Sequence, residues 1–134
     1  MKLAMVAAMA ATVLSMVCAP AAAGEKVEVP VTLEINGLGQ VTRAYGMAGT
    51  ARNSADSQQL IACFVSATTA SAQGGCEARN AAGTSTLCIT SNASLLAAVQ
   101  AVRTDSYIDF SRSAAGQCTG IYVTNGSPNA VKQP

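Results

Sequence analysis

Residues 76–88, CEARNAAGTSTLC, contain the clearest turn signal in the chain. Asn80 opens the group Asn-Ala-Ala-Gly, and Gly83 closes it. An asparagine, two residues in the right-handed conformation and a glycine in the left-handed conformation are typical of a type I turn with a G1 bulge. The sequence therefore predicts a β-hairpin that turns at this group and places Cys76 opposite Cys88.

The pattern around this turn occurs three times: a small residue, an arginine, a polar residue, two small residues and a turn residue. The three copies are residues 51–56, 78–83 and 111–116. Each copy precedes a segment that contains a cysteine and that we expect to form a strand. These segments are residues 58–67, 84–90 and 117–124. The repeated pattern predicts three hairpin corners.

Each copy has an arginine at its second position: Arg52, Arg79 and Arg112. If the three corners cluster at one end of the sheet, these side chains form a basic rim. A guanidinium rim of this kind can bind a carboxylate or sulfate group. The alternative is that each arginine pairs with a nearby acid or is solvated at a strand end. The three arginines are our candidate partner-binding residues.

Three further segments predict strands. Residues 26–36 alternate apolar and polar side chains, which is typical of a half-buried strand, and Pro30 favours an edge position because it donates no ladder hydrogen bond. Residues 60–65 are apolar on both faces, which predicts a central strand. The polar residues 66–75 that follow predict a flexible loop or an exposed strand end. Residues 106–113 predict a strand that pairs with the last cysteine-containing segment.

One helix is expected after Ser91 or Asn92, because Leu95, Leu96, Val99 and Val102 recur at helical spacing. The fold class that fits these segments is α+β and predominantly β. It is an antiparallel meander or small sandwich of about seven strands with one helix, stapled by disulfides. We expect a single β-rich domain at residues 24–125 and a flexible C-terminal tail at residues 126–134.

Residues 1–23 are typical of a secretory signal peptide. Lys2 precedes an apolar run, and Ala21 and Ala23 form a cleavage site before Gly24. A membrane anchor is the alternative, but the run is shorter than the roughly 20 residues that span a bilayer. Lipidation at Cys18 is a further alternative. We expect export to the periplasm or the extracellular space, with no integral membrane segment after processing.

Four cysteines remain after processing, and an even number in an exported small domain favours two disulfides. They are Cys63, Cys76, Cys88 and Cys118. The pairing Cys63–Cys76 with Cys88–Cys118 would close the polar loop and tie the final hairpin across the helix. The hairpin geometry around Gly83 supports a different bond, Cys76–Cys88. The sequence leaves both pairings open.

Composition excludes several kinds of chemistry. The chain has no histidine, which excludes imidazole metal sites and histidine-based catalysis. It has no C-x-x-C pair, EF-hand or phosphate-loop pattern, and its acidic residues are scattered. We therefore expect no catalytic residues, no metal and no cofactor, and a protein that is not an enzyme. Acidic and basic residues balance in the processed chain, which predicts no nucleic-acid partner.

The three tyrosines are the aromatic residues with polar tips: Tyr45, Tyr107 and Tyr122. If two of them share the exposed face of the final hairpin, they can stack on a sugar or on a partner protein. The alternative is a half-buried position in the core.

Three segments, ARNSADSQQLIACFV (residues 51–65), CEARNAAGTSTLC (residues 76–88) and DSYIDFSRSAAGQC (residues 105–118), resemble small exported bacterial proteins of unassigned function. The resemblance implies export and disulfides, and no activity. We expect a non-catalytic binding or accessory module of the bacterial envelope or secretome, with a protein or glycan partner. Two alternatives stay open: a self-associating structural subunit of the envelope or matrix, and a small inhibitor of a secreted hydrolase that inserts residues 66–75.

Overall fold

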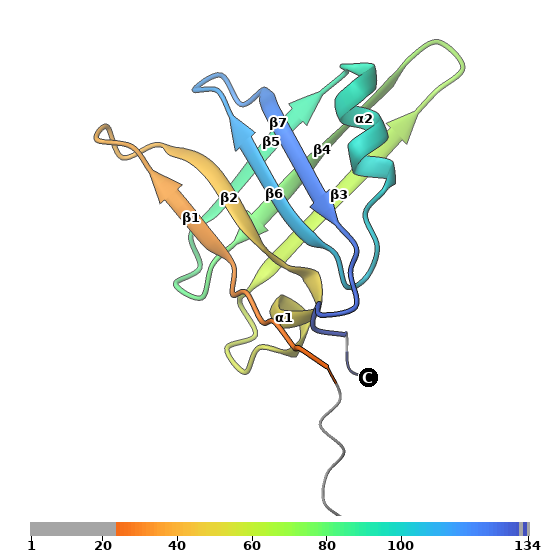
Figure 1. The fold of residues 1–134 in the computed structure, drawn as a ribbon. Helices are drawn as coiled ribbons and strands as arrows, with labels where there is room; N and C mark the ends of the chain where they lie inside the picture. Colours follow the sequence, from red (N-terminus) through yellow and green to blue (C-terminus); the bar gives the residue numbers. More distant parts are fainter. Residues whose placement is uncertain (1–23, 132, 134) are drawn as a thin grey trace, which may run out of the picture.

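The computed structural model describes residues 24–131 and 133, so the expected signal peptide at residues 1–23 lies outside the described residues. Two antiparallel sheets pack against each other (Figure 1). One sheet has the order β1-β2-β6-β7 and the other the order β3-β4-β5. This confirms the predominantly β, antiparallel fold with seven strands. The elements are β1 (Thr32–Ile35), β2 (Val41–Met47), α1 (Ala48–Asn53), β3 (Leu60–Ala67), β4 (Ala72–Arg79), β5 (Ser85–Thr90), α2 (Ala93–Gln100), β6 (Tyr107–Arg112) and β7 (Cys118–Thr124).

Three hairpin turns share one hydrogen-bond pattern. The first residue donates its amide to the carbonyl four positions on, and the glycine three positions on donates back to the first residue. The glycines are Gly39, Gly83 and Gly116, with φ of 75°, 82° and 80°. Residues with a Cβ avoid this left-handed conformation, which explains why glycine stands there. The predicted corners at residues 78–83 and 111–116 are confirmed.

The predicted corner at residues 51–56 is wrong. Its first residues form the end of α1, so the described residues contain two helices rather than the one expected. This copy of the pattern has no glycine at its end. Asp56 stands there and accepts hydrogen bonds from the amides of Gln58 and Gln59, at 2.7 and 2.9 Å. The chain therefore makes an irregular turn, in which Ser57 takes a positive φ of 55°.

The core lies between the two sheets. Ala44, Ile108 and Phe110 face it from the four-stranded sheet, and Ile61 and Ala78 face it from the three-stranded sheet. Burial of a large apolar side chain of this kind stabilises a fold by about 1.5–3 kcal/mol. The two inward faces therefore supply the main stabilisation that holds the sheets together.

Two disulfides support this core. Cys63–Cys76 joins the neighbouring strands β3 and β4, and Cys88–Cys118 joins β5 to β7 and so connects the two sheets. This is the first of the two pairings that the sequence left open. The alternative bond between Cys76 and Cys88 is wrong, although these residues do stand opposite each other in the β4–β5 ladder.

Helix α2 confirms the predicted helix. The side chain of Asn92 caps it by accepting hydrogen bonds from the amides of Ser94 and Leu95, at 2.9 and 3.2 Å. Val99 is buried, and the helix contacts β3, β4 and β7. It therefore helps to close the space between the two sheets.

Strand β3 is at the edge of its sheet and not, as expected, at the centre. It pairs only with β4, and Phe64 and Val65 each remain 39% exposed. Its residues are apolar on both faces although only one face meets the core. Residues 66–75 are not a flexible loop but the exposed end of the β3–β4 hairpin, which projects beyond the body of the domain (Figure 1). The expected edge position of the first strand is confirmed, although the β1 ladder covers only Thr32–Ile35.

Residues 126–131 pack on the domain, whereas we expected a flexible tail from residue 126. The side chain of Asn129 is buried and donates to the carbonyls of Asp105 and Thr124, at 3.0 and 3.1 Å. Asn129 also forms a short parallel bridge with Val27. Because of these contacts, the folded domain extends beyond the expected boundary at residue 125.

Candidate functional site

All three tyrosines of the chain lie on the outward face of the four-stranded sheet. Tyr45 of β2, Asp109 of β6 and Tyr122 of β7 stand opposite one another in neighbouring strands, and Tyr107 is two residues before Asp109. Side chains alternate between the two faces along a strand. Ile108 is buried, so the side chains of its neighbours Tyr107 and Asp109 point outward. We call Tyr45, Tyr107, Asp109 and Tyr122 the tyrosine face.

Arg43 fixes the charges on this face. Its Nε donates to Asp109 Oδ1 at 2.9 Å, and its Nη1 donates to Glu34 Oε1 at 2.9 Å. The hydrogen bond to Asp109 is the main reason why the pKa of Arg43 is raised. The guanidinium also lies 5.0 Å from the ring centre of Tyr45, within the range of a cation–π contact. One arginine therefore engages Asp109 of the tyrosine face and the neighbouring Glu34.

Tyr107 and Tyr122 form an aromatic pair. Their ring centres are 6.4 Å apart and the rings meet edge to face at 71°. Burial, and then the charge of Asp109, raises the pKa of Tyr107, so its hydroxyl keeps its proton at neutral pH. Tyr122 is 60% exposed. The pair therefore offers the ring of Tyr122 to solvent, in edge-to-face contact with Tyr107.

There is open space beside Tyr122. Gly120 is on the same outward face and stands opposite Ser111, and no atom lies within 4 Å of the position that a Cβ would take there. A ligand that stacks on Tyr122 can therefore reach the backbone and hydroxyl groups of the neighbouring strand. Ring faces next to hydroxyl, carboxylate and guanidinium groups are suited to a flat, amphipathic ligand.

Two of the predicted arginines come together. Arg79 and Arg112 line one surface pocket of about 520 Å³ at the ends of β4, β5 and β6. Arg79 Nε donates to the carbonyl of Gln58 at 2.8 Å, and Arg112 Nη1 donates to Thr86 Oγ1 at 3.1 Å. Glu77 lines the same pocket, yet within the described part of the chain neither arginine has a carboxylate within ion-pair distance.

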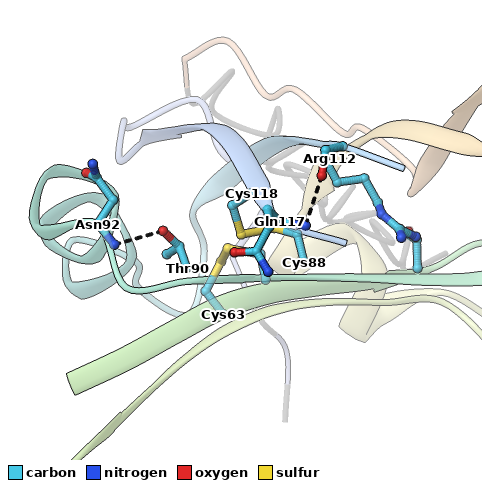
Figure 2. Close-up of a disulfide and its surroundings, with 10 residues drawn as sticks. Cys63, Cys88, Thr90, Asn92, Arg112, Gln117 and Cys118 are labelled. Carbon is cyan, nitrogen blue, oxygen red and sulfur yellow. Dashed lines mark hydrogen bonds between the residues drawn. A yellow bond between two sulfur atoms is a disulfide. The ribbon is translucent and has the colours of Figure 1, made fainter. Parts of the chain in front are cut away.

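Arg112 extends from the end of β6 toward the three-stranded sheet (Figure 2). Its Nε is buried and has no hydrogen-bond partner among the described residues. A buried guanidinium nitrogen without a partner is unfavourable. This pocket is therefore a place where a carboxylate or sulfate group could bind.

Arg52 does not join this pair. It is exposed in the last turn of α1 and lines a different surface groove, together with Gln59 and Leu60. The predicted rim of three arginines is wrong in this respect, because the copy that contains Arg52 is helical and not a hairpin corner.

The cysteines of the two disulfides lie close together in the fold. Cys63, Cys76 and Cys88 stand side by side across β3, β4 and β5. Figure 2 shows Cys88 bonded to Cys118 across the gap between the sheets, with Cys63 close by. We call Cys63, Cys76 and Cys88 the cysteine row.

Residues 24–131 and 133 contain no group of three or more histidine, cysteine, aspartate or glutamate residues that could hold a metal ion. None of the helices among these residues is long and apolar enough to cross a membrane. Searches against protein families, curated proteins and solved structures find no match to the chain.

Proposed function

We propose that this protein is an exported, non-catalytic module that binds a glycan of the bacterial envelope or secretome through the tyrosine face. The observation that carries the proposal is the grouping of all three tyrosines around Asp109 on one outward sheet face. The C–H groups of a sugar ring pack on an aromatic face while its hydroxyls need hydrogen-bond partners. Tyr122 offers the ring, and Asp109 and Ser111 offer the partners.

The electrostatics of this face support binding rather than turnover. Glycoside cleavage uses one carboxyl group as an acid and a second as a base or nucleophile. Here Glu34 and Asp109 both accept hydrogen bonds from Arg43, so both side chains are already engaged within the protein.

Two disulfides in a small domain support the exported part of the proposal, because such bonds persist in oxidising compartments. The signal-like residues 1–23 support it as well.

Titration with soluble oligosaccharides tests the proposal. Oligomers of N-acetylglucosamine and of glucose, and fragments of peptidoglycan, are suitable probes. The chain has no tryptophan, so its ultraviolet fluorescence comes from tyrosines and responds to a ligand on this face. Calorimetry gives the affinity of each oligosaccharide.

Matched variants at Tyr122 identify the site. Tyr122→Ala removes the exposed ring and should weaken binding by at least about tenfold, equivalent to about 1.4 kcal/mol. Tyr122→Phe keeps the ring and should retain most of the affinity. Leu38→Ala changes an exposed apolar residue on the β1–β2 turn and should have no effect. If no oligosaccharide binds, or if Tyr122→Ala binds as tightly as the wild type, the proposal is wrong.

A further inference from the structure

We propose that the groove between α1, β3 and the segment after α2 binds a fatty acid, with its carboxylate on Arg52 and its hydrocarbon chain in the space between the two sheets. The groove reaches the inward side of the four-stranded sheet at Ile108, whereas the tyrosine face is on the outward side. The inference therefore does not depend on the proposed glycan binding. It rests on two adjoining cavities, their apolar lining, and an arginine without an acidic partner.

The groove consists of two cavities along β3. Helices α1 and α2 both contact this strand (Figure 1). A cavity of about 220 Å³ lies beside α1, and one of about 450 Å³ lies beside residues 102–104, which follow α2. Ala48, Ile61 and Thr104 line both cavities, so the two adjoin each other. The larger cavity alone is within the range of about 300–1,000 Å³ that is usual for small-molecule sites.

The lining of the larger cavity suits a hydrocarbon chain. Ile61 from β3 and Ile108 from β6 are buried side chains of the core, and both line this cavity. Val102 packs against the same core and lines the cavity as well. A chain that enters here removes its methylene groups from water, and each buried methylene should raise the affinity by up to about fourfold.

Arg52 provides a binding site for the carboxylate at the α1 end of the groove. It is exposed and lines the smaller cavity together with Gln59. Among the residues that the structure describes, Arg52 has no carboxylate within ion-pair distance. Asp56, the nearest acidic residue in the sequence, accepts a hydrogen bond from Gln59 Nε2 at 2.6 Å and does not line the cavity. The guanidinium of Arg52 can therefore bind a carboxylate through two parallel hydrogen bonds.

Arg103 is less suited to hold the carboxylate. It lines the larger cavity, but its Nη1 already donates to the carbonyls of Gln100 and Val102, at 3.1 and 3.0 Å. Its positive charge adds to that of Arg52, and no acidic residue of the described chain lines either cavity. The groove therefore favours an anionic amphiphile over a cationic one.

Calorimetric titration of the protein with sodium dodecanoate, kept below its micelle concentration, tests the proposal. Octanoate and butyrate carry the same carboxylate on shorter chains, and dodecyltrimethylammonium carries the same chain on a cationic group. Dodecanoate should bind at a single site, and the affinity should rise with chain length by up to about fourfold for each methylene. The cationic amphiphile should bind at least about tenfold more weakly than dodecanoate.

Variants at three exposed residues locate the ligand: Arg52, Arg103 and Thr104. Arg52→Gln should weaken dodecanoate binding by about tenfold, and Arg103→Gln by less than about threefold, because only Arg52 contacts the carboxylate. Thr104→Phe places a ring where the two cavities adjoin and should weaken binding by about tenfold, whereas Thr104→Ser should not. Urea unfolding checks that each variant is folded. Tyr122→Ala should bind dodecanoate as the wild type does, which separates this groove from the tyrosine face.

The inference is overturned if the wild type does not bind dodecanoate, or if butyrate binds as tightly as dodecanoate. It is also overturned if folded Arg52→Gln binds as tightly as the wild type, or if Arg103→Gln loses as much affinity as Arg52→Gln. Vesicles of phosphatidylglycerol test a lipid surface as the source of the negative charge. If the protein sediments with these vesicles but does not bind dodecanoate, a membrane surface is the partner and the inference is wrong.

Discussion

The disulfide between the sheets should make a large contribution to stability. The double variant Cys88→Ala with Cys118→Ala opens a loop that spans 30 residues. Without this bond the unfolded chain gains conformational entropy, which lowers the free energy of unfolding by about 3.6 kcal/mol. A domain of this size has a free energy of unfolding of about 5–15 kcal/mol. We therefore expect a folded variant with much of its stability lost and a melting temperature lower by about 15–25 °C.

Urea unfolding at neutral pH, followed by circular dichroism, measures this change. The double variant Cys63→Ala with Cys76→Ala is the matched control, because it opens a loop of only 13 residues and should cost about 2.9 kcal/mol. The variant without the bond between the sheets should also have the larger slope of free energy against urea, since its unfolded chain is less constrained. A loss below about 1 kcal/mol, or a larger loss in the control, would refute this reasoning.

Three other variants test the cap of α2, the turn before β3 and the tyrosine face. Asn92→Ala should destabilise the protein to urea by about 1 kcal/mol because α2 loses its cap, whereas Asn92→Asp should restore most of the loss. Hydrogen bonds from Gln59 and from nearby backbone amides lower the pKa of Asp56 from 3.8. The contribution of Asp56 to stability is therefore complete above that pH and is lost as the pH falls through the folded-state pKa. The free energy of unfolding of Asp56→Asn, measured with urea, should depend less on acid pH than that of the wild type. Asp109→Asn removes a negative charge that raises the pKa of Tyr107, so absorbance titration should show this phenol ionising at lower pH than in the wild type. An unchanged titration would contradict the assigned geometry.

Short stretches of sequence predicted the hairpin turns and the helix α2, because the structure of each depends mainly on a few neighbouring residues. Asn80 and Gly83 define their turn within a few residues, and the spacing of Leu95 and Val99 together with Asn92 defines α2. The first copy of the turn pattern failed because Asp56 replaces the glycine that the turn needs. A comparison of the last residue of the three copies would have shown this difference.

Tertiary placement accounts for the other differences. Residues 60–65 have apolar side chains on both faces whether the strand is central or at an edge, so composition does not show how many neighbours β3 has. For the same reason the sequence could not show that Arg79 and Arg112 meet while Arg52 stands apart. The tyrosine face was closer to prediction: Tyr107 and Asp109 alternate on one side of their strand, but only the pairing of β2, β6 and β7 brings Tyr45 and Tyr122 beside them.

The cysteine row makes the order of oxidation decisive for folding. Cys76 has a neighbouring cysteine on either side, Cys63 on β3 and Cys88 on β5, and each is directly opposite it in a local hairpin. If Cys76 oxidises first with Cys88, then Cys118 has lost its native partner and the native bond between the two sheets cannot form. Only oxidation of Cys76 with Cys63 leaves Cys88 free for the distant Cys118. A chain that starts with the wrong hairpin bond can reach the native state only by exchange with an external thiol or with one of its own free cysteines.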